Sequence, residues 1–455
     1  MIFTDSAFLK SLEGCEGFDK DSFEQAHLGP APVSIRVNPY KQHAEVTKSF
    51  QDQSPVSIPW CEHGYYLKSR PVFAKDPLWH AGAYYVQEAS SMFIEYALKS
   101  VLGDQSGLKA LDLCAAPGGK STLLASMPSF QVVVANEIIH SRVPSLMENA
   151  IKWGNPRLIV SNNDPVQFEN LPGYFDVVLV DAPCSGSGLF RKDPQAYQEW
   201  KPELPEFCSA RQKRILNSAT KAISEDGYLL YSTCSYSACE NEENLDYLMA
   251  TGDFESIQLS IPTEWGIVAS VSPRYQAHGY RFYPNRIQGE GFFCAVLKKK
   301  VESQSHAQSS PNQTHVKLLS PELSRWVNSE FEWISYQKEN EVYVQLEELW
   351  DDINGLDAVL KLRKKSLRLG NLIRDELIPD HELAVSASIN NDCNQLDLTR
   401  DQAISYLKRE ELNGLEGASG WYWITYNGTG LGWAKMAGGK FKNHYPMNWR
   451  ILKQN

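Results

Sequence analysis

The sequence predicts an α/β fold with a parallel sheet. Short apolar runs rich in β-branched residues alternate with longer stretches of helical periodicity, which is typical of strands joined by crossover helices. Three of the runs lead into unusual motifs, at residues 114–121, 181–188 and 232–235. Because parallel strands carry their carboxyl ends to one edge of a sheet, we expect these motifs to lie together where such sheets bind ligands.

The first predicted strand covers residues 108–114 and is followed by a tight turn at Pro117-Gly118-Gly119. A helix then begins at Lys120. Glycines let the backbone come close to a ligand, and a helix N-terminus offers unpaired amide groups. A Gly-rich turn also serves purely structural roles, so this segment alone leaves the two interpretations about evenly balanced.

The next three predicted strands end in acids. They cover residues 131–137, 157–164 and 175–180, and the acids are Glu137, Asp164 and Asp181. Glu137 follows Lys120 by 17 residues, where a Rossmann-like unit places the carboxylate that binds two ribose hydroxyls. Asp164 suits an adenine amino group or its neighbours. Each acid alone is more often a loop or helix cap, but several suitable strand ends in register favour a Rossmann-like nucleotide site.

Two cysteines follow predicted buried strands. Cys184 comes after the run 175–180, and Cys234 comes after the run 227–231. Helices at about 140–153, 207–223 and 239–250 alternate with the strands, and a strand at 291–297 is predicted to close the sheet. Buried free thiols are common, so packing is the alternative interpretation of both cysteines. Their place at strand ends favours reactivity.

Six segments resemble the RNA 5-methylcytosine methyltransferases of the Nop/Sun group, most closely the RsmF-type bacterial ribosomal RNA enzymes. They run in family order from about residue 30 to 300: Ser34-Ile-Arg-Val-Asn-Pro39, Tyr84-Tyr-Val-Gln-Glu-Ala-Ser-Ser-Met92, Cys114-Ala-Ala-Pro-Gly-Gly-Lys120, Asp181-Ala-Pro-Cys-Ser-Gly186, Ser232-Thr-Cys-Ser235 and Gly289-Glu-Gly-Phe-Phe293. The third, fourth and fifth are highly specific. The chain departs from the family at Pro284-Asn285, where Pro-His is often found.

The resemblance implies an S-adenosylmethionine-dependent enzyme that methylates carbon 5 of a cytosine in small-subunit (16S) ribosomal RNA. Carbon 5 is a poor nucleophile until a thiolate adds to carbon 6, so covalent catalysis is expected. Cys234 inherits the attacking role and Cys184 assists the elimination that frees the RNA. Asp181 would hydrogen-bond the cytosine, and Lys120 would lower the thiol pKa. The implied cofactor-binding residues are Cys114, Ala115, Ala116, Pro117, Gly118, Gly119, Lys120, Glu137, Arg142, Asp164 and Asp181.

Two alternatives remain at this point. The catalytic motifs are shared across the family, so transfer RNA is a second candidate substrate. A methyltransferase-fold assembly factor without turnover is the other, and the joint presence of Cys234, Cys184, Asp181 and Lys120 argues against it. Amine methylation is disfavoured because Asp181-Ala-Pro-Cys184 stands where such enzymes have an Asn/Asp-Pro-Pro-aromatic motif.

Composition limits the class of protein further. The 9 cysteines in 455 residues form no Cys-x-x-Cys pair, so neither a disulfide framework nor a metal site is indicated. No run approaches the length of a membrane span, and the start lacks the features of a signal peptide. We therefore expect a monomeric cytoplasmic protein without membrane or metal partners, acting on ribosomal RNA either naked or in the assembled subunit.

Charge is the one global feature that opposes an RNA partner. The net charge of −11 would repel phosphate, although local fields govern encounter. A basic run at 361–368 is balanced between a solvated face and a binding patch. The last 35 residues carry basic groups interleaved with aromatic rings and no acid, which suits RNA. The basic residues there are Lys435, Lys440, Lys442, Arg450 and Lys453.

Changes in composition and residue pattern along the chain predict five parts. They are an N-terminal α+β RNA-methyltransferase-associated module (1–100), the Rossmann-like catalytic domain (101–299), a polar linker (300–316), a mixed domain (317–395) and a C-terminal domain (396–455). The C-terminal segments 420–435 and 442–446 are similar to the PUA-like RNA-binding β domains of RsmF-type enzymes.

Overall fold

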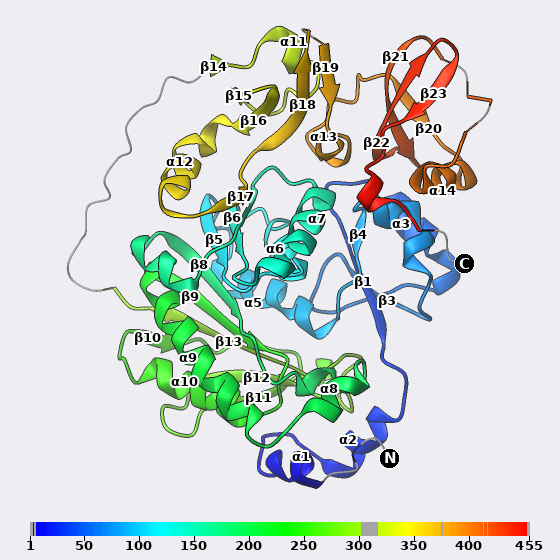
Figure 1. Cartoon of the computed structure of the whole chain (residues 1–455). Coiled ribbons are helices and arrows are strands. Elements are labelled where there is room, and N and C mark those ends of the chain that lie inside the picture. Colours follow the sequence, from blue (N-terminus) through cyan, green and yellow to red (C-terminus); the bar gives the residue numbers. More distant parts are fainter. Residues whose placement is uncertain are drawn as a thin grey trace.

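The computed structural model describes residues 3, 6–301, 317–374, 376–412, 414–415 and 417–452, and it arranges them in four sheets (Figure 1). Most of the predicted linker, residues 302–316, lies outside the described residues, as does Lys453.

The largest sheet has the strand order β11-β12-β13-β9-β8-β5-β6-β7-β17, and β10 pairs with β13. Strands β9, β8, β5, β6 and β7 run parallel, while the flanking strands are antiparallel. The chain leaves β5 toward β6 and β7, then returns to the other side for β8 and β9. The crevice between β5 and β8 is therefore the switch point where such sheets bind ligands. The bounds are β5 Leu108–Asp112, β6 Phe130–Asn136, β7 Leu158–Ser161, β8 Phe175–Asp181, β9 Ile223–Thr233, β10 Phe254–Ser256, β11 Val268–Val271, β12 His278–Phe282, β13 Phe292–Lys299 and β17 Leu362–Lys364.

The prediction that the strand at 291–297 closes the sheet was wrong. β12 and β11 continue the sheet beyond β13, and β17 adds an edge strand beside β7. These strands are short and mix polar with apolar residues, so they lack the continuous apolar run that marks a buried strand.

Helices cover both faces of this sheet. On one face α9 Leu204–Ala222 and α10 Glu242–Met249 pack against side chains such as Val178 and Val180. On the other, α5 Phe93–Leu102, α6 Gly119–Leu124 and α7 Val143–Trp153 pack against Val177 and Leu179. Successive residues of β8 thus serve opposite cores, as the period of a strand requires.

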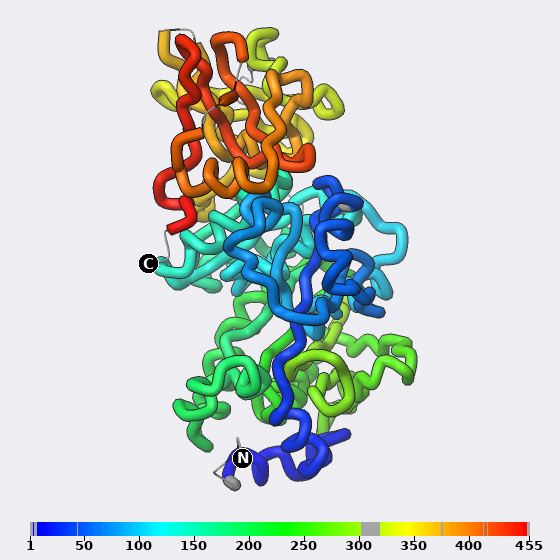
Figure 2. The backbone as a smooth tube through the Cα atoms, turned by 90° about the vertical axis from the view of Figure 1, so that its right-hand side faces the viewer, coloured from blue at the N-terminus to red at the C-terminus, as the bar shows by residue number. Residues whose placement is uncertain are grey.

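The N-terminal residues contribute to two separate cores. Helices α1 Ser6–Ser11 and α2 Lys20–His27 bury Phe8 and Phe23 against Phe190, Tyr236 and Tyr283 of the domain that holds the largest sheet, at the end of the molecule opposite the C-terminal sheets (Figures 1 and 2). The chain then runs up to a second sheet of order β2-β3-β1-β4. Its elements are β1 Val33–Val37, α3 His43–Ser49, β2 Val56–Ser57, β3 Gly64–Leu67, α4 Pro77–His80 and β4 Tyr84–Tyr85.

Two further sheets follow the linker. One has the order β14-β15-β16-β18-β19 and the other β20-β21-β22-β23, with Trp423 and Trp433 buried in the last. The bounds are β14 Lys317–Leu318, α11 Pro321–Ser324, β15 Trp333–Lys338, β16 Glu341–Leu346, α12 Trp350–Val359, β18 Leu367–Ile373, β19 Glu376–Pro379, α13 His381–Val385, β20 Gln395–Asp397, α14 Arg400–Lys408, β21 Gly420–Tyr426, β22 Thr429–Ala437 and β23 Lys440–Asn443.

The C-terminal end of α7 is the junction of these parts. Asn38 Nδ2 donates to Trp153 O at 2.9 Å, and Lys41 Nζ donates to Lys152 O at 2.5 Å. From the C-terminal half, Ala387 N donates to Gly154 O at 3.0 Å. Helix ends leave carbonyls without intrahelical partners, and here neighbouring modules supply the donors. The N-terminal sheet and the C-terminal half are thereby fixed on the domain that holds the largest sheet.

Candidate active site

The turn after β5 brings backbone to the switch point. Gly118 has a φ of 114°, which disfavours a side chain, and a Cβ there would lie 3.2 Å from Leu146 on α7. Behind the turn, Arg36 donates through Nη2 to Gly119 O at 3.1 Å and to Thr122 Oγ1 at 2.6 Å. Arg36 is 1% exposed, and burial lowers its pKa to about 10. Arg36 of the N-terminal sheet therefore holds the first turn of α6 in place.

A pocket of about 200 Å³ opens in front of this turn. Its wall includes Asp112, whose Oδ2 accepts from Ser121 Oγ at 2.6 Å while its buried Oδ1 has no partner among the described residues. Burial raises the pKa of Asp112 to about 7. The sulfonium and ammonium groups of S-adenosylmethionine are the cations that such an orphaned carboxylate would favour, so the residues fit this cofactor. The pocket is lined by Tyr85, Val86, Gln87, Glu88, Ser91, Asp112, Cys114, Ala115, Ala116, Pro117, Gly119, Lys120 and Asp181.

Glu137 lies just past β6 and is 3% exposed. Its Oε1 accepts from Ile139 N at 2.8 Å, and its Oε2 lies 3.3 Å from Arg142 Nη1 without a hydrogen bond. Arg142 Nη2 donates to Ala116 O at 2.5 Å and so connects Glu137 to the Gly-rich turn. Asp164 caps the 3₁₀ helix Pro165–Asn170 by accepting from Val166 N at 3.1 Å. The cofactor roles of Glu137 and Asp164 stay predictions.

We expect Glu137→Ala to weaken S-adenosylmethionine binding by about 1.5 to 3 kcal/mol, because charge-assisted hydrogen bonds to ribose are removed. The dissociation constant should rise about 10- to 150-fold in calorimetric titration. Glu264→Ala removes an exposed carboxylate from the same domain and serves as the control. Equal affinity of wild type and Glu137→Ala would remove the ribose assignment.

The two strand-end cysteines meet. Cys184 Sγ and Cys234 Sγ lie 2.8 Å apart, on the loops that follow β8 and β9. The hydrogen bond with Cys234, followed by burial, raises the pKa of the Cys184 thiol well above its ordinary value. The loops touch through backbone, since Gly188 N donates to Cys234 O at 2.8 Å. A Cβ on Gly188 would lie 2.4 Å from Gly291 O, so only glycine fits at residue 188, where the Gly289-Glu-Gly motif packs against the loop.

Asp181 and Lys120 form a partly buried ion pair beside the sulfurs. Lys120 Nζ lies 2.7 Å from Asp181 Oδ2, and Ser232 Oγ donates to Asp181 Oδ1 at 2.8 Å. Burial acts to lower the pKa of Lys120, but the charge and hydrogen bond of Asp181 outweigh it and the net shift is upward. Lys120 thus stays a cation at the pocket wall.

Two carboxylates of this region were not identified from the sequence. Asp112 was not singled out, although it ends a strand as the other acids do. Glu240 was also missed, because only the fold brings it to the cysteine loops. Asn285, at the departure from the family pattern, donates to Ser22 Oγ on α2 at 2.8 Å.

The doubly wound sheet, the glycine turn with its acidic pocket and the chain's similarity to a solved methyltransferase define an S-adenosylmethionine-dependent methyltransferase. That structure, a methyltransferase homolog protein from Pyrococcus horikoshii, aligns with a TM-score of 0.55 and 26% identity over 66% of this chain and 96% of its own. Three family models match: 16S rRNA methyltransferase RsmB/F at residues 99–298, the N-terminal domain of 16S rRNA methyltransferase RsmF at 5–89, and the methyltransferase RsmF PUA domain at 393–451. The chain belongs to the RsmF family of 16S rRNA methyltransferases.

Curated relatives match over nearly the whole chain. Ribosomal RNA small subunit methyltransferase F of Shewanella piezotolerans is 31% identical over 442 residues, covering 92% of this chain and 90% of that one. The protein of the same description from Vibrio parahaemolyticus is 29% identical, covering 98% and 97%. The predicted family and fold class, including the PUA-like C-terminal domain, are confirmed.

Metal-binding clusters and membrane-spanning helices are both absent from the described residues. No group of three or more His, Cys, Asp or Glu side chains in that part of the chain is placed to hold a metal ion. No helix there is long and apolar enough to cross a membrane.

Proposed function

We propose that the protein methylates carbon 5 of a cytosine in small-subunit ribosomal RNA through a covalent cysteine adduct. The observation that carries this proposal is the pair of thiols, Cys184 and Cys234, 2.8 Å apart beside the Asp181 and Lys120 pair. Methyl transfer to an amine or hydroxyl needs no thiol, whereas activation of cytosine carbon 5 needs a sulfur nucleophile. The ribosomal substrate follows from what the curated relatives are named for.

The proposed cycle begins when the Cys234 thiolate adds to carbon 6 of the cytosine. A carbon–sulfur bond forms, and the electron pair of the ring double bond moves to make carbon 5 nucleophilic. S-adenosylmethionine, when bound, supplies the electrophilic methyl group for carbon 5. Removal of the carbon 5 proton then restores the ring double bond, and the carbon–sulfur bond breaks to return the Cys234 thiolate.

The assignment of Cys234 as the nucleophile rests on the family resemblance and is supported by the raised pKa of Cys184. A thiol that stays protonated is a poor nucleophile, because the thiolate is the reactive form. Once Cys234 is bonded to carbon 6, its hydrogen bond and charge no longer raise the pKa of Cys184, so Cys184 can lose its proton to solvent and then accept the carbon 5 proton during elimination. Asp181 can accept a hydrogen bond from the exocyclic amine, and Lys120 can offset the negative charge of the attacking sulfur.

Bisulfite sequencing of 16S ribosomal RNA tests the proposal directly. RNA from cells that lack the gene should have one cytosine fewer protected from deamination, and purified protein with S-adenosylmethionine should restore that protection. Protection that changes only in transfer RNA would replace the substrate. Methyl transfer to RNA without any protected cytosine would overturn the carbon 5 assignment.

We infer that β23 contributes to RNA binding through Lys440 and Lys442, which are both exposed. Lys435, by contrast, lies 2.7 Å from Glu376 and over the Trp421 ring. Replacing both Lys440 and Lys442 with Gln should weaken RNA binding and reduce the slope of log affinity against log salt by about 1 for each phosphate that is no longer neutralised. Lys435→Gln is the control and should change the slope less. An unchanged slope in the double variant would show that this strand does not bind phosphate.

The basic run at 361–368 has a structural role in the fold. β17 pairs with β7, and basic side chains from this run are engaged within the chain. Lys364 lies 3.1 Å from Glu382, Lys365 lies 2.5 Å from Asp357, and Arg368 lies 2.7 Å from Glu341. We therefore assign RNA affinity to the C-terminal domain and not to these three side chains.

A further inference from the structure

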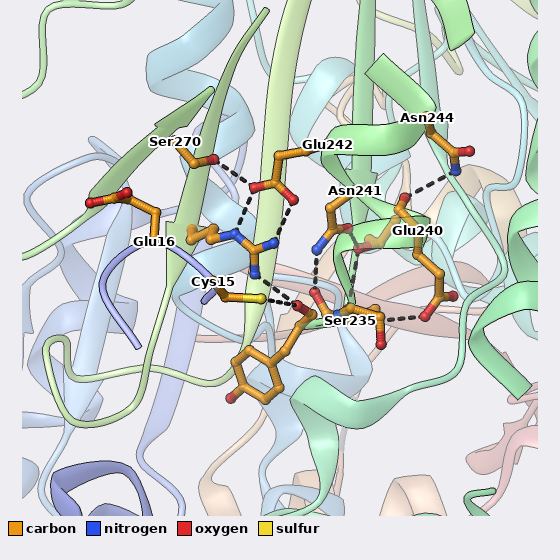
Figure 3. A network of polar contacts seen from close by, with 12 residues as sticks. Cys15, Glu16, Ser235, Glu240, Asn241, Glu242, Asn244 and Ser270 are labelled. Carbon is orange, nitrogen blue, oxygen red and sulfur yellow. Dashed lines mark hydrogen bonds and ion pairs between the residues drawn. The ribbon is translucent and has the colours of Figure 1, made fainter. Parts of the chain in front are cut away.

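Glu240 lies behind the two cysteine loops. It ends the 3₁₀ helix Ala238–Glu240, between β9 and α10, and its side chain is 0% exposed. Figure 3 shows its carboxylate directed at Ser235, the residue that follows Cys234. Burying a carboxylate is costly unless hydrogen bonds replace its hydration, so the set of its partners is informative.

The carboxylate of Glu240 accepts four hydrogen bonds. Oε1 accepts from Ser185 N at 2.9 Å and from Gln212 Nε2 at 3.0 Å. Oε2 accepts from Ser185 Oγ and from Ser235 Oγ, each at 2.5 Å. An ionised carboxylate has about four acceptor sites, and all of them are used here. Within the described residues no Lys or Arg forms an ion pair with Glu240, so neutral donors alone satisfy it.

These donors come from both catalytic loops. Ser185 directly follows Cys184, and Ser235 directly follows Cys234. The two serine hydroxyls also lie 3.1 Å from each other. Glu240 is therefore a single anchor for the residues adjacent to both sulfurs, while its own carboxylate contacts neither sulfur.

The backbone of Glu240 is itself held from several sides. Asn244 Nδ2 donates to Glu240 O at 3.0 Å, and Tyr231 Oη donates to the same carbonyl at 2.5 Å. The neighbouring Asn241 donates to Ser235 O at 2.8 Å and accepts from Thr233 Oγ1 at 2.6 Å (Figure 3). Glu240 is thus held in a fixed position relative to β9 and α10, as a residue that orients two loops must be.

We propose that Glu240 is a positioning residue that keeps the Cys184 and Cys234 loops in register, so that one cytosine can meet both sulfurs. This inference rests on the proposed covalent mechanism. The two halves of that mechanism differ in what they need: attack on carbon 6 uses Cys234 alone, whereas release uses both thiols on the same ring. Loosening the register should therefore slow release more than attack.

The test compares Glu240→Ala and Glu240→Gln with wild type in denaturing gels of labelled 16S RNA. Glu240→Ala loses all four hydrogen bonds, and we expect its turnover to fall about 10- to 100-fold at unchanged KM for RNA. The methylated, denaturation-resistant adduct should accumulate above the wild-type level. Glu240→Gln should be intermediate, because serine hydroxyls can reverse to accept from its amide. Glu243→Gln, an exposed neighbour, is the matched control and should behave as wild type.

Two further measurements separate the outcomes. S-adenosylmethionine affinity and melting temperature report whether Glu240→Ala is folded. If it is not, the double variant Ser185→Ala and Ser235→Ala serves instead, because it removes the two hydroxyl hydrogen bonds to Glu240 from the loop side. Wild-type turnover, or reduced turnover without extra adduct, would overturn the positioning role. Cys184→Ala is the positive control for adduct, and its failure to give any would count against the proposed roles of the two cysteines and not against Glu240.

Discussion

Cys234→Ala is expected to abolish methylation and to leave no covalent RNA adduct. Removing the nucleophile of a covalent mechanism removes the activated form of carbon 5, so the rate should fall by roughly 10⁴-fold or more. The measurement is methyl transfer from labelled S-adenosylmethionine to 16S RNA, with denaturing gels for the adduct. Cys393→Ala, which changes a partly buried thiol near the C-terminal sheet, is the control and should retain activity.

Cys184→Ala should behave differently although its sulfur lies only 2.8 Å from that of Cys234. Attack and methyl transfer remain available, while elimination loses its assisting thiol, so the protein should become trapped on methylated RNA. Adduct from Cys234→Ala and none from Cys184→Ala would reverse the two roles. Adduct from neither, with activity retained in both, would remove covalent catalysis from the proposal.

The parallel core could be predicted because its strands are continuous apolar runs. The predicted strands 108–114, 131–137 and 175–180 correspond to β5, β6 and β8, with ends that differ by at most two residues. The antiparallel extension could not be predicted, because strands such as β11 alternate exposed and buried positions over only four residues. β17 was not predicted for another reason: its basic residues resemble a solvated surface, and only the fold shows that Lys364 is buried and paired with Glu382.

The residues of the candidate site likewise divide into those that motifs predict and those that only the fold brings together. Cys184, Cys234, Asp181 and Lys120 could be proposed from motifs, since each lies at a strand end that the apolar runs locate. Glu240 could not, because Ala-Cys-Glu-Asn-Glu-Glu has the composition of an ordinary acidic helix start. Its importance depends on hydrogen bonds to Ser185, 55 residues away, which no local pattern encodes.

Asp181 connects two groups that differ in charge. It accepts from neutral Ser232 and pairs with cationic Lys120, which also interacts electrostatically with Cys234. Removing the negative charge of Asp181 therefore changes Lys120 as well. Burial alone would push the pKa of Lys120 down, and Asp181 is the main group that raises it. Without that carboxylate, the ammonium would lose its proton at lower pH than in the wild type.

We expect Asp181→Asn to reduce methyl transfer about 100-fold or more, because the variant lacks the carboxylate that accepts a hydrogen bond from the exocyclic amine and that keeps Lys120 a cation beside the attacking sulfur. The ratio of variant to wild-type turnover should fall as pH rises, since Lys120 progressively loses its charge only in the variant. Turnover at a series of pH values with saturating RNA and S-adenosylmethionine measures both effects. Asp226→Asn, which removes an exposed carboxylate paired with Lys298, is the control and should give a ratio near 1.

Placing Asp181→Asn in the Cys184→Ala background locates the defect within the cycle. If Asp181 stabilises the adduct, the double variant should trap much less RNA than Cys184→Ala alone, because fewer molecules reach the covalent state. If Asp181 acted only in release, the amount trapped would be unchanged, and the proposed hydrogen bond to the cytosine would have to be abandoned. A flat pH dependence of the turnover ratio would likewise show that the charge of Lys120 does not contribute to the reaction.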